Sequence, residues 1–296
     1  MRHACTTLLL ALLAAGPAPA ADGAGAADAV ARGAYLVRAA GCKACHTAEG
    51  GPAFAGGRAL ETPFGTFHTP NITPDPETGI GRWSDRDFVR ALREGLAPDG
   101  SHYYPAFPYT SYTGIRDEDL LAIKAYLFSL PPVRRPNRPH ALPFPVSQRW
   151  LLGPWKRLFF EPGPLVDDPS RPAWWNRGRY LVRALGHCGE CHSPRNLAGA
   201  MDEDRFLAGN PDGPEGEVVP NITPDRETGI GRWRVGDLVE VLRSGMLPDG
   251  DFVGGAMGEV IDEGTSHLTD ADLEAIARYL LSLPPIANPE APAGGR

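Results

Sequence analysis

Basic charge, cysteine and long apolar runs are all scarce in this sequence. Its 29 Lys and Arg are outnumbered by 36 Asp and Glu, giving a formal net charge of −7. A chain with no basic stripe lacks what a phosphate backbone requires, so we expect no nucleic-acid partner. Five cysteines in 296 residues are too few for a disulfide scaffold. With 42% hydrophobic residues, the composition predicts a globular chain of one or two domains.

Glycine and proline, in contrast, are abundant. The chain contains 35 Gly and 31 Pro, which favours short helices joined by long loops.

The first 20 residues have the pattern of an export signal. Arg2 precedes an apolar stretch from Leu8 to Ala15, and Ala18-Pro19-Ala20 is the small-residue pattern that signal peptidase cleaves. We predict a signal peptide over residues 1–20, a mature chain beginning at Ala21, and a periplasmic location. A membrane anchor is the alternative, but this apolar run is much shorter than the roughly 20 residues that span a bilayer, and no later run is long enough either.

Cleavage at this point would remove Cys5 and leave four cysteines, all within two copies of the pattern C-x-x-C-H. The copies comprise Cys42, Cys45 and His46, and Cys188, Cys191 and His192. In an exported chain this pattern predicts covalent attachment of haem c through two thioethers, with the histidine as an axial ligand of the iron. A disulfide, a redox-active C-x-x-C pair and a zinc site are the alternatives. Two motifs that use every remaining cysteine favour two haem groups.

Each motif belongs to a longer internal duplication. Residues 32–39 return as 177–184 immediately before the motifs, and NITPDPETGIGRW at 71–83 returns as NITPDRETGIGRW at 221–233. The order of the matching segments is preserved along the chain. We therefore predict a first domain over residues 21–135, a linker over 136–172 and a second domain over 173–296.

Three short helices are predicted in each copy. In the first copy they cover Ala29–Ala40, a segment after Trp83 that Ser84 caps and Gly95 ends, and Asp117–Leu130. Such helices are marginal alone, and a domain this rich in Gly and Pro has a thin core. The apolar face of a haem would complete that core.

Both halves resemble class I cytochrome c domains. The tandem is similar to the cytochrome c subunits, with two or three haems, of bacterial periplasmic alcohol, sugar and aldehyde dehydrogenases. The NITPD and ETGIGRW blocks, Pro105–Tyr109 and Leu142–Pro145 carry the resemblance, which extends from Ala27 to Ile286. It implies a mostly α fold and electron transfer from a dehydrogenase to another cytochrome or a terminal oxidase. Such a chain is an electron carrier and not itself an enzyme.

The sixth ligand of each iron is expected to differ between the copies. The family places its axial methionine after the Pro-Asp-Gly turn, where Met257 stands in the second copy. Met246 is interpreted as a core residue and Met201 as a poor candidate. The first copy has Phe107 at the matching position, which leaves His102, His68 or an open iron as alternatives. An open first haem beside a His/Met haem would also suit a dihaem peroxidase, which we keep as the alternative function.

The duplicated block supplies candidate donors to the haem propionates. The candidates are side chains with an amide, hydroxyl or indole donor: Asn71, Thr73, Trp83, Asn221, Thr223 and Trp233. The alternative is that the block builds a turn with an aromatic lid. His140, His187 and His267 are interpreted as local or solvent-facing.

The predicted linker is rich in proline and has an aromatic interior that includes Trp150, Trp155, Phe159 and Phe160. We favour a packing strap that clamps the two domains. The alternative is a docking surface for a dehydrogenase or a peripheral membrane contact, because the aromatic residues are mixed with Lys156 and Arg157.

Overall fold

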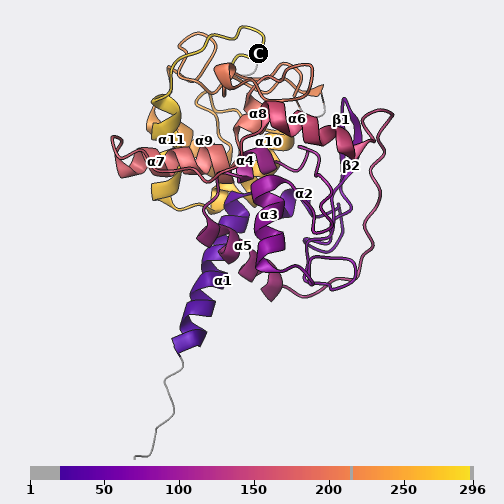
Figure 1. Cartoon of the computed structure of the whole chain (residues 1–296). Coiled ribbons are helices and arrows are strands. Elements are labelled where there is room, and N and C mark those ends of the chain that lie inside the picture. The colour runs from indigo at the N-terminus through magenta and orange to yellow at the C-terminus, as the bar shows by residue number, and fades with distance from the viewer. Residues whose placement is uncertain (1–20, 214–215, 294–296) are drawn as a thin grey trace, which may run out of the picture.

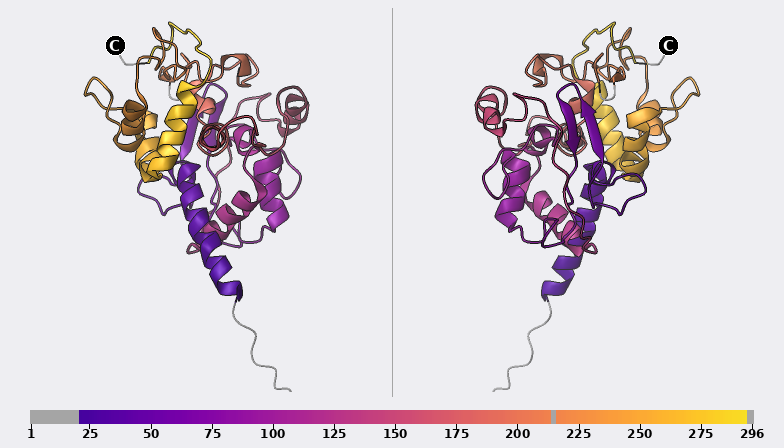
Figure 2. Two further views of the ribbon diagram at one scale, coloured as in Figure 1. Left: turned by 90° about the vertical axis from the view of Figure 1, so that its left-hand side faces the viewer. Right: turned by 90° about the vertical axis from the view of Figure 1, so that its right-hand side faces the viewer.

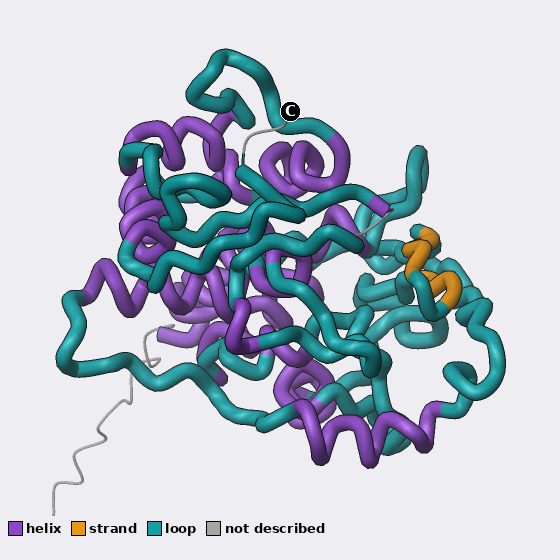
Figure 3. Tube along the Cα trace, turned by 90° about the horizontal axis from the view of Figure 1, so that it is seen from above, coloured by secondary structure: helices purple, strands orange, loops and turns teal. Residues whose placement is uncertain are grey.

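The computed structural model describes residues 21–213 and 216–293, so the predicted signal peptide lies outside the described residues. Helices dominate, and long loops join them, as Figure 3 shows. The first half of the chain and the second half pack against each other, and the second half lies at the upper left in Figure 1. This arrangement confirms the expected mostly α class.

The first and last helices of each half cross at a glycine. Helix α1 (Ala21–Ala39) crosses α5 (Asp117–Ser129) at Gly33, where a Cβ atom would lie 1.9 Å from the carbonyl oxygen of Ala122. Helix α7 (Ala173–Tyr180) crosses α11 (Asp270–Leu281) in the same way, since a Cβ atom on Gly178 would lie 2.2 Å from the Ala275 oxygen. Only glycine permits such a close approach, so the duplicated sequence forms the same crossing twice.

The ends of several helices lie where capping residues in the sequence predict them. Helix α3 (Asp85–Glu94) begins with a capping box between Ser84 and Asp87, and it ends at Gly95 with φ 63°. Its predicted bounds are confirmed, as are those of α5 to within one residue. Helix α1 begins eight residues before the predicted Ala29, because the alanine-rich segment that precedes it continues the helix.

The remaining elements are short and separated by loops. The first half contains α2 (Cys42–Cys45), strands β1 (Ala59–Thr62) and β2 (Gly65–His68), and α4 (Tyr109–Tyr112). The linker contains the 3₁₀ turn η1 (Arg149–Leu151) and α6 (Leu152–Phe159). The second half contains the π-helical turn η2 (Leu181–Leu185), α8 (Gly189–His192), η3 (Glu203–Arg205), α9 (Val235–Ser244), α10 (Gly255–Glu263) and η5 (Thr265–His267).

Strands β1 and β2 form an antiparallel hairpin, with Ala59 paired to His68 and Thr62 to Gly65. The hairpin belongs to the first half, and the sequence pattern did not predict it. It positions the chain just before Pro70, which bears on the first site below.

One hydrophobic core runs through both halves. Leu36 and Val37 of α1 belong to the same buried cluster as Leu181 and Leu185 of η2. Figure 2 shows from two sides how the indigo and yellow halves meet. The two copies therefore share a core, although their sequences read as two separate domains.

Two hydrogen bonds cross this interface in a reciprocal pattern. The Tyr35 hydroxyl donates to Asp272 at 2.6 Å, and the equivalent hydroxyl of Tyr180 donates to Asp119 at 2.6 Å. Arg32 pairs with Asp119 and Arg177 with Asp272 within their own copies. Equivalent residues thus make equivalent contacts in both directions, the pattern of a pseudo-two-fold interface.

The linker packs against the first half through buried polar contacts. The Lys156 ammonium donates to the carbonyl oxygens of Glu94 and Gly95, at 2.6 and 2.7 Å. It thus provides hydrogen-bond donors for carbonyl groups at the C-terminal end of α3. Burial lowers the pKa of Lys156 to about 8, although Glu94 partly opposes the shift. Further along the linker, the backbone N–H of Leu165 donates to the Gly114 oxygen. These contacts support the packing-strap interpretation of the linker.

Between residues 21 and 213 and between 216 and 293, no helix is both long and apolar enough to span a bilayer.

Candidate haem sites

Each C-x-x-C-H motif forms a single helical turn. Gly41, with φ 62°, ends α1 and allows the chain to turn into α2, which contains both thiols of the first motif. In the second motif, Cys188 immediately precedes α8, and this helix includes Cys191 and His192. A helical turn brings two cysteines three residues apart onto the same face, as attachment to two haem vinyl groups requires.

The chemistry of the thiols argues against the other interpretations of the motif. The four cysteines of the described residues form no disulfide with one another. Burial raises the pKa of Cys42 and of Cys188 to about 12, whereas a redox-active pair needs a stabilised thiolate. In the described part of the chain, no group of three or more His, Cys, Asp or Glu is arranged to hold a metal ion.

Both histidines of the motifs are oriented by a proline carbonyl. His46 Nδ1 lies 2.7 Å from the Pro70 oxygen, and His192 Nδ1 lies 2.8 Å from the Pro220 oxygen. A carbonyl oxygen only accepts, so Nδ1 carries the proton in each case and Nε2 keeps its lone pair. Burial lowers the pKa of both imidazoles, although the carbonyl partners act in the opposite direction. A neutral imidazole fixed in this tautomer fits the role of an axial iron ligand.

The two prolines were missed at the sequence level. Pro70 and Pro220 immediately precede the duplicated NITPD blocks, so the signal was present as one further identical position. Their role is visible only when the fold places that loop against the histidine.

The duplicated block forms a hydrogen-bonded turn. The Asn71 amide nitrogen donates to the oxygens of Thr78 and Val133, at 3.2 and 2.7 Å, and its carbonyl oxygen accepts from the Thr73 hydroxyl and backbone N–H. Asn221 and Thr223 repeat these contacts with Thr228 and Ile286. The side chains expected to bind propionates are therefore engaged in the turn, which favours the structural alternative for both Asn and both Thr residues.

The two tryptophans of the duplicated block differ from its asparagines and threonines in their hydrogen bonding. The indole N–H groups of Trp155 and Trp175 donate to protein oxygens, whereas within the described residues those of Trp83 and Trp233 have no acceptor. Trp83 and Trp233 thus retain a donor that a propionate could accept.

Met257 is the third residue of α10 and is half-buried. Met201 packs on the backbone of the second attachment turn, with its sulfur 2.9 Å from where a Cβ atom on Gly189 would lie. The prediction that Met246 is a core residue was wrong. Its side chain is 40% exposed, because it follows Gly245 at the end of α9 and pairs with Phe252 in an open turn.

In the first half, the position of Met257 is occupied by an aromatic side chain. The ring of Phe107 packs against Tyr103 and Tyr112, with centroids 5.4 and 5.9 Å apart. The imidazole of His102 faces α6, since its Nε2 lies 3.5 Å from where a Cβ atom on Gly153 would be. Both His102 and His68 have a buried Nδ1 without a partner in the described chain.

Two histidines interpreted as local or solvent-facing make longer-range contacts. The ring of His187 packs against Tyr112 of the other half, with centroids 5.3 Å apart, so it lies in the interface between the copies. His140 packs against Phe67 and accepts a hydrogen bond from the backbone N–H of His68 through Nδ1. His267 is exposed, as expected.

The second attachment turn contacts the first half across the interface. Burial raises the pKa of Cys191 to about 11; Glu190 and, more weakly, Cys45 of the first turn add to the shift, and Arg195 opposes it. The carboxylate of Glu190, between the second pair of cysteines, accepts hydrogen bonds from Thr110 at 2.7 Å and Ser111 at 2.6 Å in α4. Burial alone would raise the pKa of Glu190, but Arg195 and the two hydroxyls together lower it.

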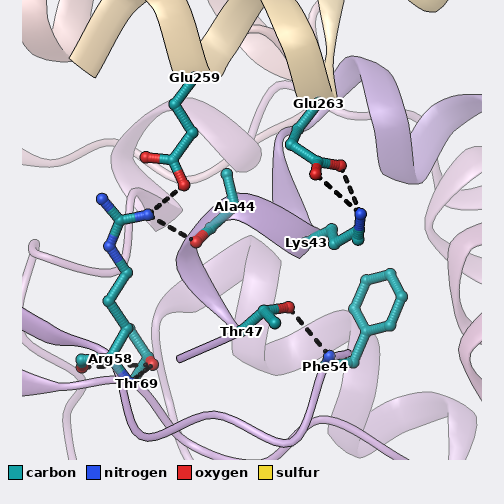
Figure 4. A network of polar contacts seen from close by, with 8 residues as sticks. All are labelled: Lys43, Ala44, Thr47, Phe54, Arg58, Thr69, Glu259 and Glu263. Carbon is teal, nitrogen blue, oxygen red and sulfur yellow. Dashed lines mark hydrogen bonds and ion pairs between the residues drawn. The ribbon is translucent and has the colours of Figure 1, made fainter. Parts of the chain in front are cut away.

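In the other direction, residues at the first attachment site contact the second half through ion pairs. Figure 4 shows Lys43 and Arg58 of the first half pointing toward Glu263 and Glu259 of α10. The first attachment turn thus touches α10, which carries Met257, and the second touches α4, which begins two residues after Phe107.

A fold of paired helices around two C-x-x-C-H turns, each with a carbonyl-oriented histidine, defines a c-type cytochrome. The Cytochrome c family model matches residues 30–131. A "Diheme cytochrome c-type" protein of Cereibacter sphaeroides is 48% identical over 261 residues, covering 86% of this chain and 86% of the relative.

Two further relatives are longer. The "Alcohol dehydrogenase (quinone), cytochrome c subunit" of Gluconacetobacter polyoxogenes is 42% identical over 94% of this chain and 60% of its own length. The "Gluconate 2-dehydrogenase cytochrome c subunit" of Pantoea cypripedii is 42% identical over 86% of this chain and 59% of its own length. The chain belongs to the cytochrome c family, and it holds two covalently bound haem c groups.

Proposed function

We propose that this chain is a periplasmic electron carrier that accepts electrons from a dehydrogenase and passes them to another cytochrome or a terminal oxidase. The bound haem groups supply the one-electron chemistry. The observation that carries the proposal is the shared hydrophobic core, against which Cys42 of the first attachment turn and Cys188 of the second both pack, because it would bring the two redox groups together. Relatives named as cytochrome subunits of dehydrogenases favour a carrier over a peroxidase.

In this proposal the chain's own residues bind and tune the groups. Cys42 and Cys45 would hold the first group and Cys188 and Cys191 the second. His46 and His192 would ligate the irons through Nε2, with Met257 as the distal ligand of the second iron. The indoles of Trp83 and Trp233 would donate to propionates.

The test is reduction by a physiological donor. Ferric holoprotein is mixed with a purified dehydrogenase of the kinds whose cytochrome subunits are similar to this chain, alcohol dehydrogenase (quinone) or gluconate 2-dehydrogenase, together with that enzyme's substrate. We expect the α-band of both reduced haems to appear at a rate that depends on the dehydrogenase concentration. Hydrogen peroxide turnover with a reduced donor, and no reduction by the dehydrogenase, would favour the peroxidase alternative.

We further propose that the dehydrogenase docks on an exposed apolar face of the linker. Phe144, Trp150 and Leu158 of the linker are 83%, 68% and 76% exposed, and large apolar side chains exposed to this degree are candidates for contact with a partner. A hollow of about 650 Å³ beside α6 reaches Glu190 of the second attachment turn. Arg157 at the edge of the hollow has no ion-pair partner in the described residues and suits an acidic group of the dehydrogenase.

A surface variant tests this docking face. Replacing Trp150 and Leu158 by serine should slow reduction by the dehydrogenase and leave the haem spectrum unchanged. Loss of sedimentation with phosphatidylethanolamine–phosphatidylglycerol vesicles, at an unchanged rate of reduction, would assign the face to the membrane instead.

A further inference from the structure

Helix α10 receives two ion pairs from the other half of the chain. The Lys43 ammonium lies 2.8 and 2.7 Å from the two carboxylate oxygens of Glu263, and the Arg58 guanidinium contacts Glu259 (Figure 4). Lys43 lies between the two cysteines of the first attachment turn. Met257 precedes Glu259 by two residues on α10.

The basic partners are themselves fixed to the first attachment site. Arg58 also donates to the Ala44 carbonyl oxygen at 2.9 Å, which ties its guanidinium to the attachment turn. Its backbone exchanges hydrogen bonds with Thr69, the residue before the carbonyl-bearing Pro70. The two cations therefore belong to the rigid part of the first site.

Helix α10 has few other means of holding its position. Of its nine residues, all of them described, only Ile261 is buried. Gly254 at its N-cap has no side chain to cap the helix, and Gly255 and Gly258 lower its helical propensity. An element with so little buried apolar surface depends on its remaining contacts.

The ion pairs are partly shielded from solvent. The side chains of Arg58 and Glu259 are 29% and 37% exposed, and those of Lys43 and Glu263 are 43% and 33% exposed. Such pairs are stronger than fully exposed ones, and two on one face of a short helix restrain both its position and its rotation.

The geometry points to Glu259 and Glu263 as positioning residues for Met257, held in place by the attachment turn of the first haem. The first site would thereby determine how firmly the distal ligand of the second site is bound. This inference rests on the proposed role of Met257.

The test measures the bond between the methionine and the second iron directly. In ferric holoprotein, a weak near-red charge-transfer band reports methionine sulfur on haem iron, and added imidazole competes for the same position. For the double variant Glu259→Gln/Glu263→Gln we expect a weaker band. Imidazole should bind at the second haem about tenfold more tightly, since two partly exposed pairs are lost.

Controls separate this role from a general loss of stability. Glu274→Gln removes an exposed ion pair with Arg278 on α11 and changes the charge by the same sign without touching α10. It should leave band and affinity unchanged. Lys43→Gln should weaken the band from the other side of the pair, and exchanging the charges in Lys43→Glu/Glu263→Lys should restore it in part.

Three results would overturn the inference. One is a double variant with two haems and an unaltered band and imidazole affinity. Another is an equal effect in Glu274→Gln. The third is a wild-type protein with two haems but no methionine band, which would remove Met257 as the ligand, whereas a protein with no haem at all would refute the proposed function itself.

Discussion

The two haem sites are alike on the histidine side and different on the opposite side. Both histidines donate to a proline carbonyl, and both following blocks form the same Asn–Thr turn. At the position expected to face the iron from the other side, the first copy has Phe107 in an aromatic cluster and the second has Met257 on α10, a helix with one buried residue. Attachment and histidine orientation impose one geometry on any such site, whereas the distal side is free to vary and sets the potential.

The contacts between the copies differ in the same way. The first attachment turn reaches α10 through Lys43, while the second has Gly189 at the matching position and reaches α4 through the buried carboxylate of Glu190. Equivalent segments therefore meet in both directions across the interface. Substitutions have changed the residues that make the contact, so that one contact is an ion pair and the other is a set of hydrogen bonds.

The largest expected effect comes from breaking one site at a time. Replacing Cys42 and Cys45 by alanine should leave a protein with one covalent haem and about half the Soret absorbance, because each motif binds its own group. The matching variant at Cys188 and Cys191 should also retain one. Loss of both haems in either variant would mean that the two sites are not independent in attachment.

Exchanging the distal residues should exchange the spectra of the two sites. Met257→Leu should abolish the near-red band and lower the potential of the second haem, since axial ligands span a range of about 0.8 V. Phe107→Met should create a second band. An unchanged ferric spectrum in Met257→Leu would show that another residue ligates the second iron.

The duplicated turns should contribute equally to stability. Asn71→Ala and Asn221→Ala each leave buried donors and acceptors unpaired, which costs about 1–3 kcal/mol. Urea unfolding of the holoproteins should show similar losses for both variants, with two haems retained. A loss of haem binding at unchanged stability would instead restore the propionate role of these side chains.

The reciprocal tyrosine contacts should have smaller effects. Tyr180→Phe and Tyr35→Phe each remove two cross-copy hydrogen bonds, together worth about 1–2 kcal/mol. One is donated by the hydroxyl to an aspartate, and the other is accepted by it from a backbone N–H. Burial raises the pKa of Asp272, but its bonds with Arg177 and Tyr35 outweigh this and lower it overall.

The pH dependence of Tyr35→Phe gives this contact a second readout. A lowered carboxyl pKa stabilises the fold above the pKa of the unfolded chain, and this stability is lost as pH falls through the folded value. Unfolding followed between roughly pH 5 and pH 2 should therefore show a shallower acid dependence in Tyr35→Phe than in the wild type. An identical pH profile would contradict the assignment.

The sequence predicted what local chemistry determines. Ser84 and Gly95 fixed the ends of α3, and the duplication fixed the order of the helices in both halves. It did not predict the β1–β2 hairpin, α6 or the exposure of Met246, since these depend on how distant segments pack.

The sequence also did not predict the surroundings of the two histidines or the interface between the two copies. Pro70 contributes a backbone carbonyl, which residue type does not reveal, and Tyr35 meets Asp272 only after both copies have folded. Asn71 was expected to bind a haem propionate, but a short polar side chain can instead form hydrogen bonds within its own turn, as Asn71 does with Thr73.

The most direct measurement of the central claim is the intact mass of the denatured holoprotein, produced in a host that attaches haem c. The account predicts the mass of the mature polypeptide plus two haem groups, and an α-band on reduction whose intensity corresponds to two haems per chain. A mass equal to the polypeptide alone, or to the polypeptide with a single haem, would contradict it.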